Sequence, residues 1–114
     1  MQSGLYVALS SQISLEKRLN TIADNLANMN TVGFRATQLK FDDVVTRAEG
    51  TKVDYVSTGK EYLSDANGGM VQTENPLDFA AKGNTWFSID TPSGNAITKD
   101  GRFSMLQTGD LVTL

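Results

Sequence analysis

The chain has 114 residues, of which 39% are hydrophobic, and its formal net charge is -3 at pH 7. It has no cysteine and no histidine, which excludes disulfide frameworks, thiolate metal sites and the commonest metal ligand and general base. Basic residues cluster only at Lys17-Arg18, so we expect no nucleic acid and no anionic membrane as a partner. No apolar run approaches the ~20 residues of a bilayer crossing, and no cleaved secretory signal is visible, so we expect no membrane insertion.

The first thirty residues carry apolar side chains at heptad spacing, in alternating steps of three and four. This pattern predicts a long helix from about Ser3 to Asn28 that packs lengthwise against other helices. A second apolar stripe lies beside this seam, so the helix needs at least two neighbours. The polar Gln12 within the seam either sets the packing register or faces solvent. The seam comprises Leu5, Ala8, Gln12, Leu15, Leu19, Ile22, Leu26 and Met29, and the second stripe comprises Tyr6, Leu9, Ile13, Ala23 and Ala27.

The sequence after the helix predicts a bend. Asn and Gly tolerate the left-handed conformation that closes a helix, and β-branched Thr31 disfavours its continuation. The side chains of Asn25, Asn28, Asn30 and Thr31 either form a network with the backbone that fixes the bend, or are a plain polar helix end. Phe34 follows as a large apolar anchor.

Residues 35–66 lack a sustained period and predict an extended connector that lies on its neighbours, with a short strand at Val53–Val56. Phe41, Val44 and Val45 fit either a short helical turn or the edge of a strand. From residue 67 the pattern becomes that of antiparallel strands and tight turns. Because neighbouring strand residues face opposite ways, we expect one of Trp86 and Phe87 to be buried and the other exposed. The predicted strands are Met70–Thr73, Phe79–Ala81, Trp86–Ile89, Ala96–Lys99, Arg102–Leu106 and Leu111–Leu114, with a five-residue loop at Thr91–Asn95 and a turn at Asp100-Gly101.

These elements predict an α+β fold in three parts. Residues 1–34 form a coiled-coil-type helix and bend, residues 35–66 the connector, and residues 67–114 the start of an incomplete, antiparallel β-rich outer domain. The last strand is apolar and has no polar cap, from which we expect a fragment of a longer protein. The alternative is that the seam belongs to one amphipathic helix of an ordinary small α+β domain. Two stripes and few charges favour packing between molecules, and therefore an assembly protein over an enzyme.

No constellation of catalytic, cofactor-binding or metal-binding residues is found. The adjacent Asp42 and Asp43 cannot enclose a cation alone and are interpreted as a solvated acidic pair. Ser10 and Ser11 have no histidine as a base and no nucleophile turn. Gly68-Gly69 is followed by no G-K-[ST] and is not a phosphate loop.

Three ordered blocks resemble the flagellar rod and hook protein family. Residues 25–35 match every defined position of the family pattern N-(L/I)-A-N-x-x-T-x-G-(F/Y)-(K/R). Residues 73–87 resemble T-x-N-P-L-D-x-A-I-x-G-x-x-F-F, with Ala81 in place of Ile and Trp86 in place of the first Phe. Residues 98–112 resemble T-R-x-G-x-F…G-x-L-V, with Lys99 in place of Arg. The opening residues 3–10 look most like the proximal-rod members of the family.

The resemblance implies a non-enzymatic structural subunit of the periplasmic rod of the bacterial flagellar basal body, without cofactors. It implies assembly with copies of itself and neighbouring rod proteins, transit through the flagellar export apparatus, and transmission of torque. It also implies a C-terminal helix that pairs with the N-terminal one, and we expect this chain to lack that helix. The alternative is a small β-domain binding module with a helical oligomerisation arm. The predicted assembly interface is Leu5, Leu9, Leu15, Leu19, Ile22, Leu26 and Met29, and the family-motif residues are Asn25, Asn28, Thr31, Gly33, Phe34, Asn75, Pro76 and Asp78.

Overall fold

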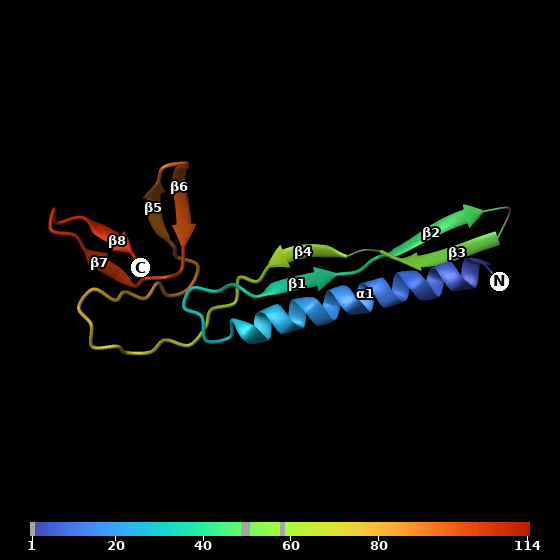
Figure 1. The fold of residues 1–114 in the computed structure, drawn as a ribbon, viewed down its shortest axis with the longest axis horizontal. Helices are drawn as coiled ribbons and strands as arrows, with labels where there is room; N and C mark the ends of the chain where they lie inside the picture. The colour runs from blue at the N-terminus through green and yellow to red at the C-terminus, as the bar shows by residue number, and fades with distance from the viewer. Residues whose placement is uncertain (1, 49–50, 58) are drawn as a thin grey trace. The chain divides into compact units, whose positions relative to one another are not determined.

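A computed structural model describes residues 2–48, 51–57 and 59–114, and the chain divides into two units. The first unit contains the chain up to Met29 together with Ala36–Ser64, and the second contains Asn30–Arg35 and Asp65–Leu114. One helix is followed by antiparallel strand pairs, which confirms the predicted α+β class (Figure 1).

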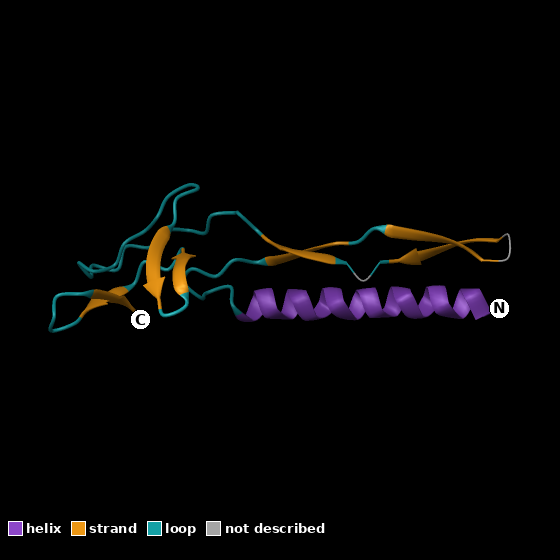
Figure 2. Ribbon diagram, turned by 90° about the horizontal axis from the view of Figure 1, so that it is seen from above, coloured by secondary structure: helices purple, strands orange, loops and turns teal. Residues whose placement is uncertain are grey.

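The first unit is built on a single helix, α1 (Gln2–Ala27), of 26 residues. Its observed bounds agree closely with the range predicted from the heptad repeat. The helix ends through a tightened last turn, in which the Met29 N–H donates to Leu26 O at 3.3 Å. Two strand pairs run alongside α1 (Figure 2).

The strand pairs of the first unit follow one another along the helix. Strand β1 (Thr37–Lys40) pairs with β4 (Lys60–Leu63), and β2 (Asp43–Ala48) pairs with β3 (Thr51–Val56), both antiparallel. Residues 35–66, expected to form an extended connector, therefore contain four strands. Strand β3 was predicted, and of the two alternatives for Val44 and Val45 the strand is the one observed, in β2. Residues 49–50 and 58 of that connector lie outside the described residues.

The two strand pairs are separated by a short interruption of the ladder. There the Ser57 N–H donates to Asp42 O at 2.9 Å, while the Ser57 hydroxyl accepts from the Asp42 N–H at 2.9 Å. Gly59 adopts a φ of 82°, and a Cβ on it would lie 2.8 Å from the Phe41 ring. The close approach of this ring to the backbone explains why glycine occupies the break.

The second unit contains two hairpins. Strand β5 (Phe87–Thr91) pairs with β6 (Gly94–Thr98), and β7 (Phe103–Met105) pairs with β8 (Leu111–Thr113). The first hairpin turns over two residues, 92–93, so the predicted five-residue loop is wrong. Pairing begins earlier because Gly94, at a φ of 121°, pairs directly with Thr91.

Two other strand predictions in the second unit are also wrong. Residues 70–73 are irregular, and around residues 79–81 the ladder is limited to one isolated bridge between Asp78 and Arg102. Short apolar runs do not make strands where no neighbouring strand supplies hydrogen bonds, and Pro76 interrupts the segment between them.

Within the described residues, no hydrophobic side chain is fully buried. The best-defined apolar contacts join three rings of the second unit: Phe103 lies 6.1 Å from Phe79 and 5.5 Å from Phe87 between centroids. Trp86 and Phe87 are both half-buried, which contradicts the expectation that one would be buried and the other exposed. Such extensive apolar exposure is unusual for a protein that acts as a monomer.

Candidate assembly surface

The face of α1 that lies on the chain's own strands is mainly polar. Its half-buried and buried positions recur at steps of three or four, on the side of the helix opposite the heptad seam. Most carry a hydroxyl, an amide or an amine. They are Val7, Ser10, Ser11, Ser14, Lys17, Thr21, Asn25 and Asn28.

Ser14 is the centre of this polar face, with only 7% of its surface exposed. Its hydroxyl lies 2.9 Å from Ser10 O within the helix and 3.2 Å from Ser57 O at the break between the strand pairs. One proton is therefore shared between a helical carbonyl and the carbonyl at the break between the strand pairs. A turn further along, the Lys17 ammonium lies 3.3 Å from a Glu61 carboxylate oxygen of β4.

Asn25 joins the helix to β1 through both ends of its amide. Asn25 Nδ2 donates to Thr37 O at 2.9 Å, and Asn25 Oδ1 accepts from the Thr37 N–H at 3.0 Å. Asn28 likewise bonds to backbone, because its Nδ2 donates to Asp24 O at 2.9 Å. That these side chains together fix the bend stays a prediction. Asn25 makes its contact across the unit, however, and not within the bend.

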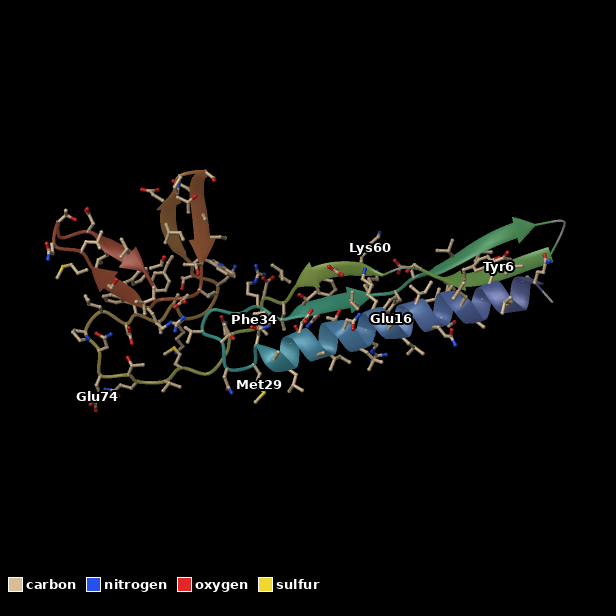
Figure 3. The ribbon with its side chains drawn as sticks, viewed as in Figure 1. Tyr6, Glu16, Met29, Phe34, Lys60 and Glu74 are labelled. Carbon is tan, nitrogen blue, oxygen red and sulfur yellow. The ribbon has the colours of Figure 1, made fainter. Side chains whose placement is uncertain are left out.

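The opposite face of α1 is apolar and uncovered in the described structure. Leu19 is 66% exposed and Leu26 65%, and Met29 points away from the strands in Figure 3. The second stripe is exposed as well, with Tyr6 at 57%. All seven predicted interface residues are thus on the surface: Leu5, Leu9, Leu15, Leu19, Ile22, Leu26 and Met29.

The bend after the helix packs within the second unit. The Phe34 N–H donates to Thr31 O at 3.3 Å and closes a turn around Gly33, whose φ is 74°. A Cβ at Gly33 would lie 2.7 Å from the Asp100 backbone nitrogen. Phe34 is 39% exposed, so it forms an incompletely covered apolar anchor.

The Asn75-Pro76-Leu77-Asp78 motif forms a hydrogen-bonded turn. Asn75 Oδ1 accepts from the Leu77 N–H at 3.2 Å, and Asn75 Nδ2 donates to Asp78 Oδ1 at 3.1 Å. The other Asp78 oxygen accepts from the Thr73 hydroxyl at 2.6 Å. The turn presents Leu77 O to the Phe103 N–H at 3.3 Å, so the second and third sequence blocks lie against each other.

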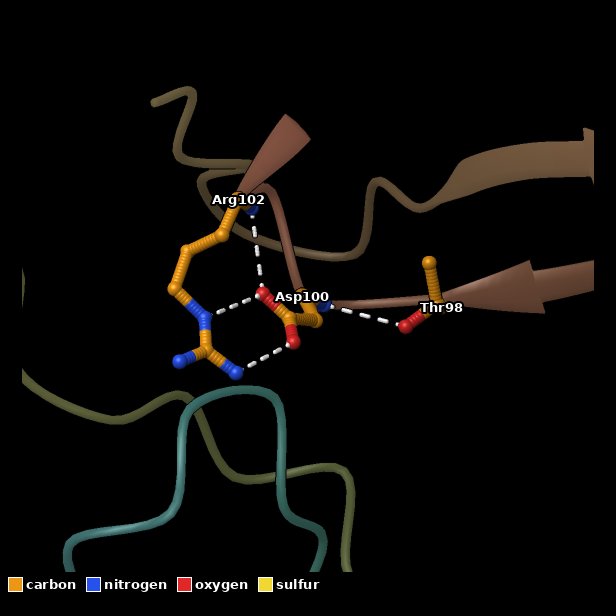
Figure 4. Close-up of polar contacts among 3 residues, drawn as sticks. All are labelled: Thr98, Asp100 and Arg102. Atoms are coloured by element: carbon orange, nitrogen blue, oxygen red, sulfur yellow. Dashed lines mark hydrogen bonds and ion pairs between the residues drawn. The ribbon is translucent and has the colours of Figure 1, made fainter. Parts of the chain in front are cut away.

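A charged pair, Asp100 and Arg102, lies near the start of the third block (Figure 4). Asp100 Oδ1 accepts from Arg102 Nε at 3.0 Å, and Asp100 Oδ2 accepts from Arg102 Nη2 at 2.8 Å. The Arg102 side-chain hydrogen bond holds the pKa of the Asp100 carboxyl below its ordinary value, against the opposing effect of partial burial. The same bond raises the pKa of Arg102. Asp100 is therefore ionised and oriented at neutral pH.

Trp86 lies against two cations. The Arg35 guanidinium is 4.7 Å and the Lys99 ammonium 4.6 Å from its ring centroid. Arg35 also pairs with Asp65, and Lys99 Nζ donates to Gly83 O at 2.6 Å. This contact was not predicted from the sequence. The signal available was that Arg35, Trp86 and Lys99 each fall within one of the three family-like blocks.

The described part of the chain shows neither a metal-binding cluster nor a membrane-spanning helix. No group of three or more acidic side chains among residues 2–48, 51–57 and 59–114 gathers closely enough to hold a metal ion. No helix in those same ranges combines the length and apolar character needed to cross a membrane.

Comparison with known proteins gives consistent matches. Residues 5–35 match the family model described as flagella basal body rod protein. The whole chain is 62% identical to flagellar basal-body rod protein FlgF of Rhizobium meliloti (strain 1021) and 56% identical to FlgF of Mesorhizobium japonicum. Flagellar hook protein FlgE of Brucella abortus biovar 1 is 34% identical over 98 residues, 83% of this chain and 25% of the hook protein.

These matches confirm the resemblance to flagellar rod proteins that the three sequence blocks indicated. The chain spans about half the length of the curated relatives it matches, 47% for each of the two FlgF proteins.

Proposed function

We propose that this FlgF-like chain belongs to a structural subunit of the bacterial flagellar basal-body rod. The observation that carries the proposal is the division of α1 into two faces. The polar face is held by the chain's own strands, and the apolar seam is left open along the helix. An apolar seam at heptad spacing is suited to lengthwise packing against other helices.

The proposal includes a mechanical, non-enzymatic role in the periplasmic rod. Self-copies and neighbouring rod proteins are the expected partners, and the export apparatus is the expected route to the rod. Many parallel side-chain contacts along a helix distribute load without any chemical step, so the subunit would transmit torque by packing alone. The rod-protein names of the relatives support this role.

The seam is tested in the bacterium that makes the protein, with Leu19→Asp placed in its own gene. Because Leu19 is 66% exposed in the chain, the substitution should leave helix content unchanged by circular dichroism. It should abolish flagellation and swimming, because a carboxylate cannot be buried in an apolar helix interface without a large desolvation cost. Asn20→Asp, at the neighbouring exposed position outside the seam, serves as the matched control and should still swim.

Normal flagellation in the Leu19→Asp strain would contradict the proposed interface. The alternative binding module is distinguished by the purified chain in analytical ultracentrifugation. A stable small oligomer that Leu19→Asp dissociates, together with unaffected swimming, would support an oligomerisation arm instead of a rod subunit.

A further inference from the structure

We propose that Asn67 is a site of spontaneous modification, at which the side-chain amide is converted to a carboxylate with release of ammonia. Asn67-Gly68 is the only Asn-Gly pair in the chain. In this chemistry the following backbone nitrogen attacks the asparagine side-chain carbon. Glycine at that next position obstructs the attack least, because it lacks a Cβ and moves freely through φ and ψ.

The surroundings of Asn67 leave the backbone free to reach the reactive geometry. Both Asn67 and Gly68 are exposed, in a segment without helix or strand. A Cβ built on Gly68 would meet nothing within 4 Å. Among the backbone hydrogen bonds found between described residues, none engages the Gly68 N–H. The attacking nitrogen is therefore accessible to solvent base.

The side-chain carbonyl of Asn67 is also polarised. Its Oδ1 lies 3.3 Å from Lys99 Nζ, which donates to it. The ammonium withdraws electron density from Cγ and stabilises the negative charge that develops on Oδ1 during attack. Gly68 N, after losing its proton to solvent, bonds to Cγ. The Cγ–Nδ2 bond then breaks as Nδ2 takes a proton from solvent, and the nitrogen leaves as ammonia. Water then opens the five-membered imide, giving aspartate or isoaspartate.

The chain contains an internal comparison at Asp100-Gly101, where the same ring closure would expel water from the carboxyl group. There the carboxylate is held by two Arg102 nitrogens, at 3.0 Å and 2.8 Å. An ionised carboxylate is a poor target for a nucleophile. Gly101 is buried, with its Cβ position filled by the Phe79 carbonyl, and its own carbonyl accepts from the Phe79 N–H at 2.9 Å. The fold therefore protects the Asp100-Gly101 pair from ring closure and leaves the Asn67-Gly68 pair exposed to it.

Conversion of Asn67 changes the neighbourhood of Trp86. The new carboxylate faces Lys99 Nζ, which lies 4.6 Å from the Trp86 ring centroid. The isoaspartate product also lengthens the backbone by one methylene, a few residues before the turn at Asn75.

The proposal is tested by incubating the full 114-residue chain in neutral buffer and mapping its peptides by mass spectrometry. We expect acid products at Asn67, while Asn84, Asn95 and Asp100 stay unchanged over the same time. Gly68→Ala should suppress the product. Gly69→Ala, at an equally open position, should leave it unaffected. In concentrated urea, isomerisation at Asp100 should appear, because its protection comes from the fold.

An intact Asn67 after incubation would overturn the proposal, as would equal conversion in the Gly68→Ala chain. Isomerisation of Asp100 in native buffer as fast as conversion of Asn67 would overturn the protection argued from Arg102 and Gly101. Isoaspartate-specific methyl labelling provides an independent readout, because it detects the rearranged product without relying on the small mass change.

Discussion

Asn25 and Thr37 exchange two hydrogen bonds, with the side-chain amide of the first meeting both peptide groups of the second at 2.9 Å and 3.0 Å. Antiparallel strands offer one another the same donor–acceptor pair. The helix therefore binds β1 as a further strand would, through a single side chain. This gives a structural reason for asparagine at the first position of the family-like motif.

Replacing Asn25 by alanine should loosen β1 from α1. The change leaves the Thr37 N–H and C=O without their partner, and we expect a loss of about 1–3 kcal/mol in the free energy of unfolding. Hydrogen exchange at the Thr37 amide and urea denaturation measure the effect. Asn20→Ala, on the same helix but exposed, should change stability by less than about 0.5 kcal/mol. Equal losses in both variants would contradict the role assigned to Asn25.

A second prediction separates backbone strain from crowding at Gly33. Gly33 and Gly83 have nearly the same φ, 74° and 72°, but only Gly33 has close neighbours at its Cβ position. Gly83→Ala should cost about 1–2 kcal/mol, from the left-handed backbone alone. Gly33→Ala should cost clearly more, because its Cβ would press on the backbone nitrogen of Asp100. Urea denaturation followed by Trp86 fluorescence compares the two, and equal costs would show that the neighbouring backbone yields.

The Asp100–Arg102 pair predicts a pH dependence. Because the folded pKa of Asp100 is lowered from 3.8, its contribution to stability is fully present above the unfolded pKa and is lost as pH falls through the lower folded pKa. Urea midpoints should therefore fall in acid, most steeply below pH 3.8. In Asp100→Asn that part of the acid dependence should disappear. A variant with an unchanged pH profile would show that the pair does not stabilise the second unit.

The cations beside Trp86 predict a spectroscopic change. Lys99→Met removes the ammonium near the ring and should shift the tryptophan emission and lower stability by about 0.5–1 kcal/mol. Trp86 is the only tryptophan, so the signal is unambiguous. Lys82→Met, which removes an exposed cation of the same unit, is the control and should leave the emission unchanged. Identical spectra in the two variants would contradict the cation–π contact.

The helix was predicted from sequence because its heptad repeat extends over eight positions, a signal that single substitutions do not obscure. The hairpin of β5 and β6 was predicted by its turn residues, although Gly94 allowed a tighter turn than expected. By contrast, β1 and β4 were not predicted, and a helical turn and a strand edge were both open for Val44 and Val45 of β2, because these segments carry little alternation. Strand β1 lies on the polar face of α1, and β4 reaches that face through the Lys17–Glu61 ion pair. A periodicity of Ser, Thr and Asn is not a recognised signal for strand binding.

The candidate assembly surface was also predicted only in part, because the sequence shows periodic patterns but not contacts between distant residues. The heptad repeat predicts directly which residues form the apolar face of α1, because nearly all of its positions carry apolar side chains. Pairings between distant residues, such as Lys17 with Glu61 or Arg35 with Trp86, depend on tertiary geometry that spacing along the chain does not contain. The family-like blocks marked several of these residues without indicating what they contact.

The polar underside and the apolar outer seam of α1 should respond oppositely to temperature. Hydrogen bonds such as those of Ser14 and Asn25 are enthalpic in character, whereas burial of apolar surface near room temperature is driven by entropy and weakens on cooling. If the seam packs between molecules as proposed, warming should strengthen that packing while it weakens the hydrogen bonds between the strands and their own helix. Cooling should have the opposite effect on both.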